Sequence, residues 1–84
     1  MIIRKIYNKI YKLFIKHGKY TTYIDGCKVE TNYVHNKKNG IELKYHEDGT
    51  LEMTSNYENG KLNGILIKYK RDGNILQKTY YKNG

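Results

Sequence analysis

The pattern of apolar and polar positions changes its period near Gly18. In segment 2–16 the apolar residues recur at intervals of three and four, which places them on one side of a helical wheel. The opposite side of that wheel carries only basic and amide side chains. We therefore predict an N-terminal amphipathic helix, with residues 1–17 as a separate segment and Gly18 as the helix cap.

After Gly18 the apolar positions alternate with polar ones, as in a half-buried strand. Segments 41–45 and 65–69 show this alternation, and each is followed by an Asp-Gly pair. Asp-Gly is a strong hairpin signal, because both residues tolerate the positive φ of tight turns. Second strands are predicted after the turns, at 51–57 and 75–81. Each unit thus reads as strand, turn, strand and connector.

These units form a repeat with an offset of 24 residues, seen for example from Gly40 to Gly64. The clear copies span 34–57 and 58–81, and a degraded copy with shorter spacings spans 18–33. Residues 82–84 resemble the start of a further copy. A fixed period of this size is typical of a repeat architecture, in which stacked units display a surface rather than enclose a catalytic pocket.

The clearest copy runs Tyr57-Glu58-Asn59-Gly60-Lys61-Leu62-Asn63-Gly64, followed by strand 65–69 and the turn Asp72-Gly73. This arrangement resembles the bacterial-type variant of the MORN repeat over residues 18–84. The resemblance implies an elongated antiparallel meander of repeated β-hairpins, so the expected fold is mainly β with one preceding helix. It also implies an interaction or scaffold protein. Many bacterial members carry an antitoxin label, large DNA viruses encode many such repeats, and lipid binding was the family's original association.

Composition sets limits on the partner. The 84 residues suffice for one domain, and 16 basic against 8 acidic residues give a net charge of +8. A basic surface indicates nucleic acid or an anionic membrane. However, Ile, Lys, Asn and Tyr make up about half of the chain, and all four have AT-rich codons, which explains much of the charge. Arg occurs only at Arg4 and Arg71, although it is the usual residue for bidentate phosphate binding.

No constellation of an enzyme is legible in the sequence. The three His residues are scattered and do not recur between copies, and the single Cys27 cannot form a Cys-based metal cluster. The Asp residues repeat at turns, where Asp is favoured. The glycines lack the spacing of a phosphate-binding loop. We therefore expect a non-enzymatic protein without metal or cofactor.

The tyrosines allow two interpretations. One column at repeat spacing contains Tyr33, Tyr57 and Tyr81, and a second contains Tyr23, Tyr45 and Tyr69. Stacked aromatic side chains pack favourably along a sheet, so the columns are foremost structural. A binding stripe for a protein or for nucleic-acid bases is the alternative.

The expected function is protein binding, through an exposed sheet face or through the open C-terminal edge of the sheet, where a second copy could also add. Candidate contact residues on the face are Glu42, Lys44, Lys68, Lys78 and Tyr80. The first alternative is peripheral membrane association through the basic helix. Its candidate contacts are Ile3, Lys5, Ile6, Lys9, Ile10 and Phe14. Nucleic-acid binding by the Lys- and Tyr-rich sheet is the second alternative.

The sequence shows neither a signal-peptide core nor an apolar run that could cross a membrane, so we expect an intracellular, cytoplasmic location. For the helix itself, packing of its apolar side against the first hairpin is the structural interpretation. Binding to a groove of a partner protein is a further one.

Overall fold

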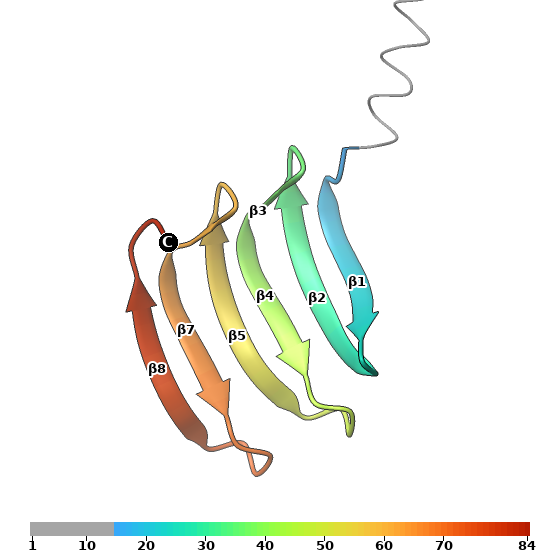
Figure 1. The fold of residues 1–84 in the computed structure, drawn as a ribbon, viewed down its shortest axis with the longest axis vertical. Coiled ribbons are helices and arrows are strands. Elements are labelled where there is room, and N and C mark those ends of the chain that lie inside the picture. Colours follow the sequence, from blue (N-terminus) through green and yellow to red (C-terminus); the bar gives the residue numbers. More distant parts are fainter. Residues whose placement is uncertain (1–14) are drawn as a thin grey trace, which may run out of the picture.

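A computed structural model describes residues 15–84, which form one open, antiparallel sheet (Figure 1). The predicted N-terminal helix and its membrane-contact residues lie outside the described residues. The strands of the sheet are β1 (Gly18–Ile24), β2 (Cys27–Val34), β3 (Lys37–Lys38), β4 (Gly40–Tyr45), β5 (Leu51–Glu58), β6 (Lys61–Leu62), β7 (Gly64–Tyr69) and β8 (Ile75–Tyr81).

The sheet is a meander in which strands follow one another in the order β1-β2-β4-β5-β7-β8, and the two-residue strands β3 and β6 pair with β2 and β5. Hairpins β1–β2, β4–β5 and β7–β8 are the three copies of the repeat. The copies join through β2–β4 and β5–β7, where Glu30 pairs with Leu43 and Thr54 pairs with Ile67. The predicted mainly-β meander of hairpins is therefore confirmed.

Two kinds of turn connect the strands. Asp25-Gly26 and Asn59-Gly60 are two-residue turns with positive φ at both positions, the conformation that matches the twist of paired strands. His35-Asn36 forms the same turn without glycine, because Asn tolerates the left-handed region. Asp48-Gly49 and Asp72-Gly73 lie instead in longer loops, such as the one that the hydrogen bond from His46 N to Thr50 O closes at 2.7 Å.

Glycine and tyrosine face each other at one end of every hairpin. Gly18 pairs with Tyr33, Gly40 with Tyr57, and Gly64 with Tyr81. Gly64 has a φ of +102°, and a Cβ atom there would lie 3.3 Å from the Asn56 side chain. The repeat therefore needs glycine at this position for its backbone conformation and for its close approach to Asn56.

The connectors stack on one another with the same period. The Gly60 amide donates to the Lys38 carbonyl at 2.8 Å, and the Gly84 amide donates to the Leu62 carbonyl at 2.6 Å. At the connector that follows the degraded copy, the Asn36 amide donates to the Lys16 carbonyl at 2.7 Å. The degraded copy therefore keeps the stacking contact, although its sequence is shorter.

No second layer covers the sheet within residues 15–84. Val29 is the one large hydrophobic side chain that is buried in this range. The described part of the fold is consequently held together mainly by strand pairing and by side-chain rows across neighbouring strands, as expected for stacked repeats.

Candidate binding surfaces of the sheet

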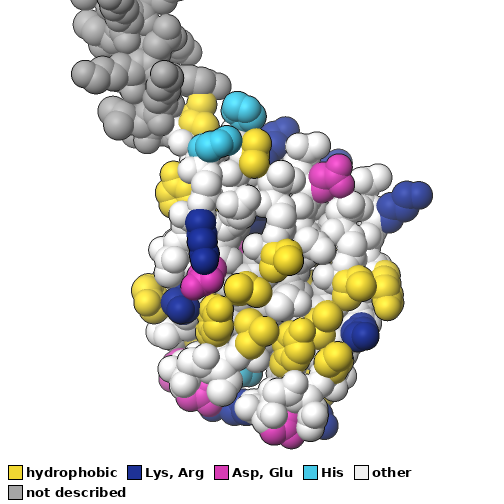
Figure 2. Space-filling model, turned by 180° about the vertical axis from the view of Figure 1, so that it is seen from behind, with side chains coloured by type: hydrophobic (Ala, Val, Ile, Leu, Met, Phe, Trp, Pro, Cys, Tyr) yellow, Lys and Arg dark blue, Asp and Glu magenta, His cyan; other side chains and the backbone are white. Residues whose placement is uncertain are grey.

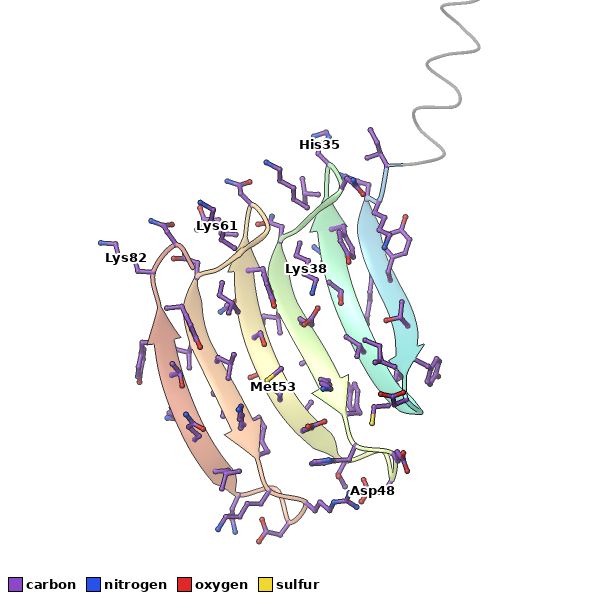
Figure 3. The ribbon with its side chains drawn as sticks, viewed as in Figure 1. His35, Lys38, Asp48, Met53, Lys61 and Lys82 are labelled. Atoms are coloured by element: carbon purple, nitrogen blue, oxygen red, sulfur yellow. The ribbon has the colours of Figure 1, made fainter. Side chains whose placement is uncertain are left out.

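Strand alternation divides the side chains between two faces. Residues that pair directly across strands lie on the same face, so the register assigns each row. Glu42, Ser55 and Met53 belong to the face that is viewed in Figures 1 and 3, called here the front face. Ile41, Leu43 and Thr54 belong to the opposite, rear face, which Figure 2 shows.

The rear face carries an exposed group of apolar side chains. Leu43 and Ile67 flank Thr54 from either side, and Ile65 pairs with Tyr80. Ile41 is 59% exposed, Ile65 38% and Tyr80 71%. In Figure 2 hydrophobic side chains gather over the centre of this face. The rear apolar patch is defined here as Ile41, Leu43, Ile65, Ile67 and Tyr80. An exposed patch of this kind, bordered by polar groups, is typical of an interaction site.

A shallow hollow continues the patch toward β1. It has a volume of about 270 Å³ and lies beside Ile41 and Leu43, with Lys19, Glu30 and Asn32 on its other side. The hollow therefore has an apolar wall and a charged wall.

Positive charge surrounds the patch. Lys19, Lys28 and Lys78 share the rear face by register. Glu30 is the acidic residue among them, and it is neutralised by Lys19 Nζ at 3.3 Å and by Lys28 Nζ at 3.4 Å. Burial alone would raise the pKa of Glu30, but these two lysines lower it below its usual value. The rear face thus combines an apolar centre with a net positive rim.

The front face is held by an internal polar network. Glu42 is only 8% exposed, accepts a hydrogen bond from Thr31 Oγ1 at 2.7 Å and pairs with Lys38 Nζ at 2.8 Å. Burial would lower the pKa of Lys38, but the hydrogen bond and charge of Glu42 outweigh it and raise that pKa. Lys38 also lies over the Tyr57 ring, with Nζ 4.9 Å from its centroid. Figure 3 shows Lys38 reaching over this face.

A similar contact covers a neighbouring tyrosine. Lys16 Nζ lies 4.9 Å from the centroid of the Tyr33 ring, as Lys38 does over Tyr57. On the rear face, Lys28 Nζ lies 4.6 Å from the Tyr45 ring. The two predicted tyrosine columns therefore lie on opposite faces, and these three rings are engaged by lysines of the same chain.

The five predicted contact residues do not form one surface. Glu42, Lys44 and Lys68 lie on the front face, whereas Lys78 and Tyr80 lie on the rear face. The expectation that Glu42 is exposed was wrong, because Lys38 and Thr31 satisfy its carboxylate in a buried position. Tyr80 is strongly exposed and belongs to the rear apolar patch.

Sequence reasoning missed Ile41 and Ile65 as surface residues. It treated the apolar positions of each strand as the buried side and the Glu and Lys positions as the exposed side. The signal that was available is the length of the chain, since a small repeat sheet has few residues with which to build a covering layer.

The hairpin loops at the opposite end of the sheet are also linked. Arg71 Nη1 donates to Asp48 Oδ2 at 3.3 Å, and Asp48 Oδ1 accepts from the hydroxyl and the amide of Thr50. These contacts lower the pKa of Asp48 below its ordinary value of 3.8. The hydrogen bond from the Thr50 hydroxyl contributes most, the one from the Thr50 amide comes next, and the charge of Arg71 contributes less. The stability that this contact adds is thus present above pH 3.8 and is lost as the pH falls through the lower, folded pKa.

Within residues 15–84, no three His, Cys, Asp or Glu side chains come together as a metal site. No helix of that same range is long and apolar enough to span a bilayer. In comparisons with known proteins, no family model, curated protein or solved structure matches the chain.

Proposed function

We propose that this protein is a non-enzymatic interaction module of the MORN-repeat type that binds another protein through the rear face of its sheet. The observation that supports this most is the rear apolar patch, whose central residues Ile41 and Ile65 are exposed on paired strands of the sheet. Side chains fixed on paired strands lose little freedom on binding, which favours a specific complex.

The chemistry of the partner follows from the rim. Lys19, Lys28 and Lys78 surround the apolar centre, with Glu30 neutralised between two of them. A partner that presents apolar side chains bordered by Asp or Glu would complement both features. An acidic rim would speed association at low salt, whereas the apolar centre would hold the complex at high salt.

The test compares variants of the full chain. Partners retained from a host lysate through a high-salt wash would be identified and purified, and their affinity measured. We expect Ile41→Ser with Ile65→Ser to weaken binding about tenfold or more, because both side chains lie at the centre of the contact. Tyr20→Ser is the matched control, since Tyr20 is 36% exposed, close to the 38% of Ile65, but pairs with Thr31 on the front face.

The competing functions give different outcomes in the same assay. Retention of anionic vesicles or of single-stranded nucleic acid, lost as salt rises and unchanged by the two rear-face substitutions, would overturn the proposal in favour of a membrane or nucleic-acid function. An antitoxin-like role requires that the identified partner is a toxic protein whose activity falls when this chain binds.

A further inference from the structure

The two edge strands concentrate the exposed apolar side chains. Of the eight large hydrophobic side chains that residues 15–84 expose, three lie on β1 and three on β8. They are Tyr20, Tyr23, Ile24, Ile75, Leu76 and Tyr80. Edge strands of natural sheets are usually blunted by proline, short length or charge, because their unpaired backbone groups recruit other strands. The chain contains no proline, and β1 and β8 are seven residues long.

The repeat makes this concentration more informative. Gly40 and Gly64 occupy equivalent places in their hairpins, and so do Glu52 and Leu76, or Asn56 and Tyr80. At these two positions the last hairpin carries an apolar residue on its outer strand where the preceding copy carries a polar one, whereas Met53 and Thr54 are replaced by Gln77 and Lys78. Terminal repeats that end in water normally have a polar outer surface, and the changes to Leu76 and Tyr80 run against this.

The outer sides of β1 and β8 are also complementary by register. At each junction between copies, the second strand of one hairpin pairs with the first strand of the next hairpin. Val29 pairs with Lys44 at the first junction, and Met53 pairs with Lys68 at the second. Strand β8 is the second strand of the last hairpin, and its Gln77 is equivalent to Met53. Strand β1 is the first strand of the first hairpin, and its Thr22 is equivalent to Lys44.

We infer that β8 of one molecule pairs with β1 of a second copy, head to tail, in the register of the internal junctions. Gln77 then lies opposite Thr22, where its amide can donate to the hydroxyl. The second pair of the internal junctions, Thr54 with Ile67, likewise places Lys78 opposite Thr21. The register ends at the bulge of Leu76, and antiparallel pairing brings the exposed Ile75 and Leu76 to the same end of the interface as the exposed Tyr23 and Ile24. This goes beyond the proposed function, because it uses the strand edges and not the rear apolar patch.

The described residues next to each edge strand do not pair with it. Residues 15–17 turn toward the β2–β3 connector, where the Lys16 carbonyl accepts from the Asn36 amide. Residues after β8 turn toward β6, where Gly84 donates to the Leu62 carbonyl. The interface joins two different surfaces, so it propagates into an open chain of molecules unless the geometry closes a ring.

Charge sets the condition for assembly. The net charge of +8 makes the molecules repel one another at low ionic strength. Raising the salt from ~0.01 M to ~0.15 M shortens the Debye length from about 30 Å to about 8 Å, so we expect association to strengthen. Binding to nucleic acid would respond in the opposite direction.

The experiment is sedimentation velocity of the full chain over a range of concentration and salt, with charge placed at the pair Gln77 and Thr22. Gln77→Lys alone places an ammonium opposite Thr22, and Thr22→Glu alone places a carboxylate opposite Gln77. Each single change should weaken self-association about tenfold, and the double variant should restore it through a Lys–Glu pair between molecules. Two controls change the net charge away from both edge strands: Glu47→Gln matches Gln77→Lys, and Lys61→Gln matches Thr22→Glu. Each control should change self-association only as far as the change in net charge does.

Three outcomes would overturn the inference. One is a monomer at every concentration and salt; another is a failure of the double variant to restore association while circular dichroism shows a folded sheet. The third comes from cysteine cross-linking in a Cys27→Ser background: a Gln77→Cys chain linking to itself, rather than to a Thr22→Cys chain, means symmetric β8–β8 pairing. None of these results bears on the rear-face variants, so the two proposals fail separately.

Discussion

At the neighbouring positions 41 and 42, the apolar side chain is exposed and the charged one is buried. The Glu42 carboxylate is buried between Thr31 and Lys38, whereas the Ile41 side chain is 59% exposed. A single-layer sheet has water near both faces, so burial is decided by which neighbouring side chains are long enough to cover a position. Lys38 is long enough, and its ion pair and its contact with Tyr57 hold it over the front face.

At this scale we expect Glu42→Gln to lower the free energy of unfolding by about 1–3 kcal/mol, because Lys38 then keeps a partly buried charge without its counter-ion. Urea unfolding followed by circular dichroism measures the change. Arg71→Gln is the control, since it breaks an exposed pair with Asp48 and should change the free energy of unfolding much less. Equal effects of the two substitutions would show that the Glu42 network adds nothing beyond a surface ion pair.

The hairpin is the element that carries the fold. Each copy places a glycine opposite a tyrosine at one end and a loop at the other, and its connector bonds to the preceding connector. The alternation of apolar and polar residues predicted the four long strands of the two clear copies, β4, β5, β7 and β8, to within a residue at each end. For β1 and β2 it gave only the span of the degraded copy. The two-residue strands β3 and β6 were not predicted, because two residues carry no periodicity, and only their pairing with β2 and β5 defines them.

For the hairpin we expect Gly64→Ala to destabilise more than Gly49→Ala. Both glycines have positive φ, so each substitution carries a backbone cost of about 1–2 kcal/mol. Only at Gly64 would the added Cβ also press on Asn56, at 3.3 Å, whereas the space beside Gly49 is open. Thermal unfolding of the two variants measures the difference. A larger loss at Gly49 would mean that the loop, and not the glycine–tyrosine row, limits hairpin stability.

As a whole molecule, the described sheet is a row of hairpins whose members contact only their neighbours. Stability in such an array is shared between the units and their junctions, so the central strands open less often than the edges. The same property leaves both faces and both edges available for contacts, which is why the rear apolar patch and the edge pairing exist together.

We therefore expect hydrogen exchange to be slowest in β4 and β5, the two central strands of the sheet, and fastest in the edge strands β1 and β8 at low protein concentration. Exchange measured by mass spectrometry at increasing concentration and salt should slow selectively in β1 and β8, if these edges pair between molecules. Uniform protection across the sheet at all concentrations would contradict both the independent opening of the edges and their pairing.

The sequence by itself determined the hairpins, their 24-residue period and their antiparallel order, because alternation, Asp-Gly and Asn-Gly pairs and the recurring Gly and Tyr act locally. It did not determine which side of each strand is covered. That depends on contacts between residues far apart in the chain, such as Lys38 over Tyr57 or Glu42 beside Thr31. Only the tertiary structure decided that Glu42 is buried, that the tyrosine columns lie on opposite faces, and that Ile41 and Ile65 meet water, because register and side-chain reach set burial in a one-layer sheet.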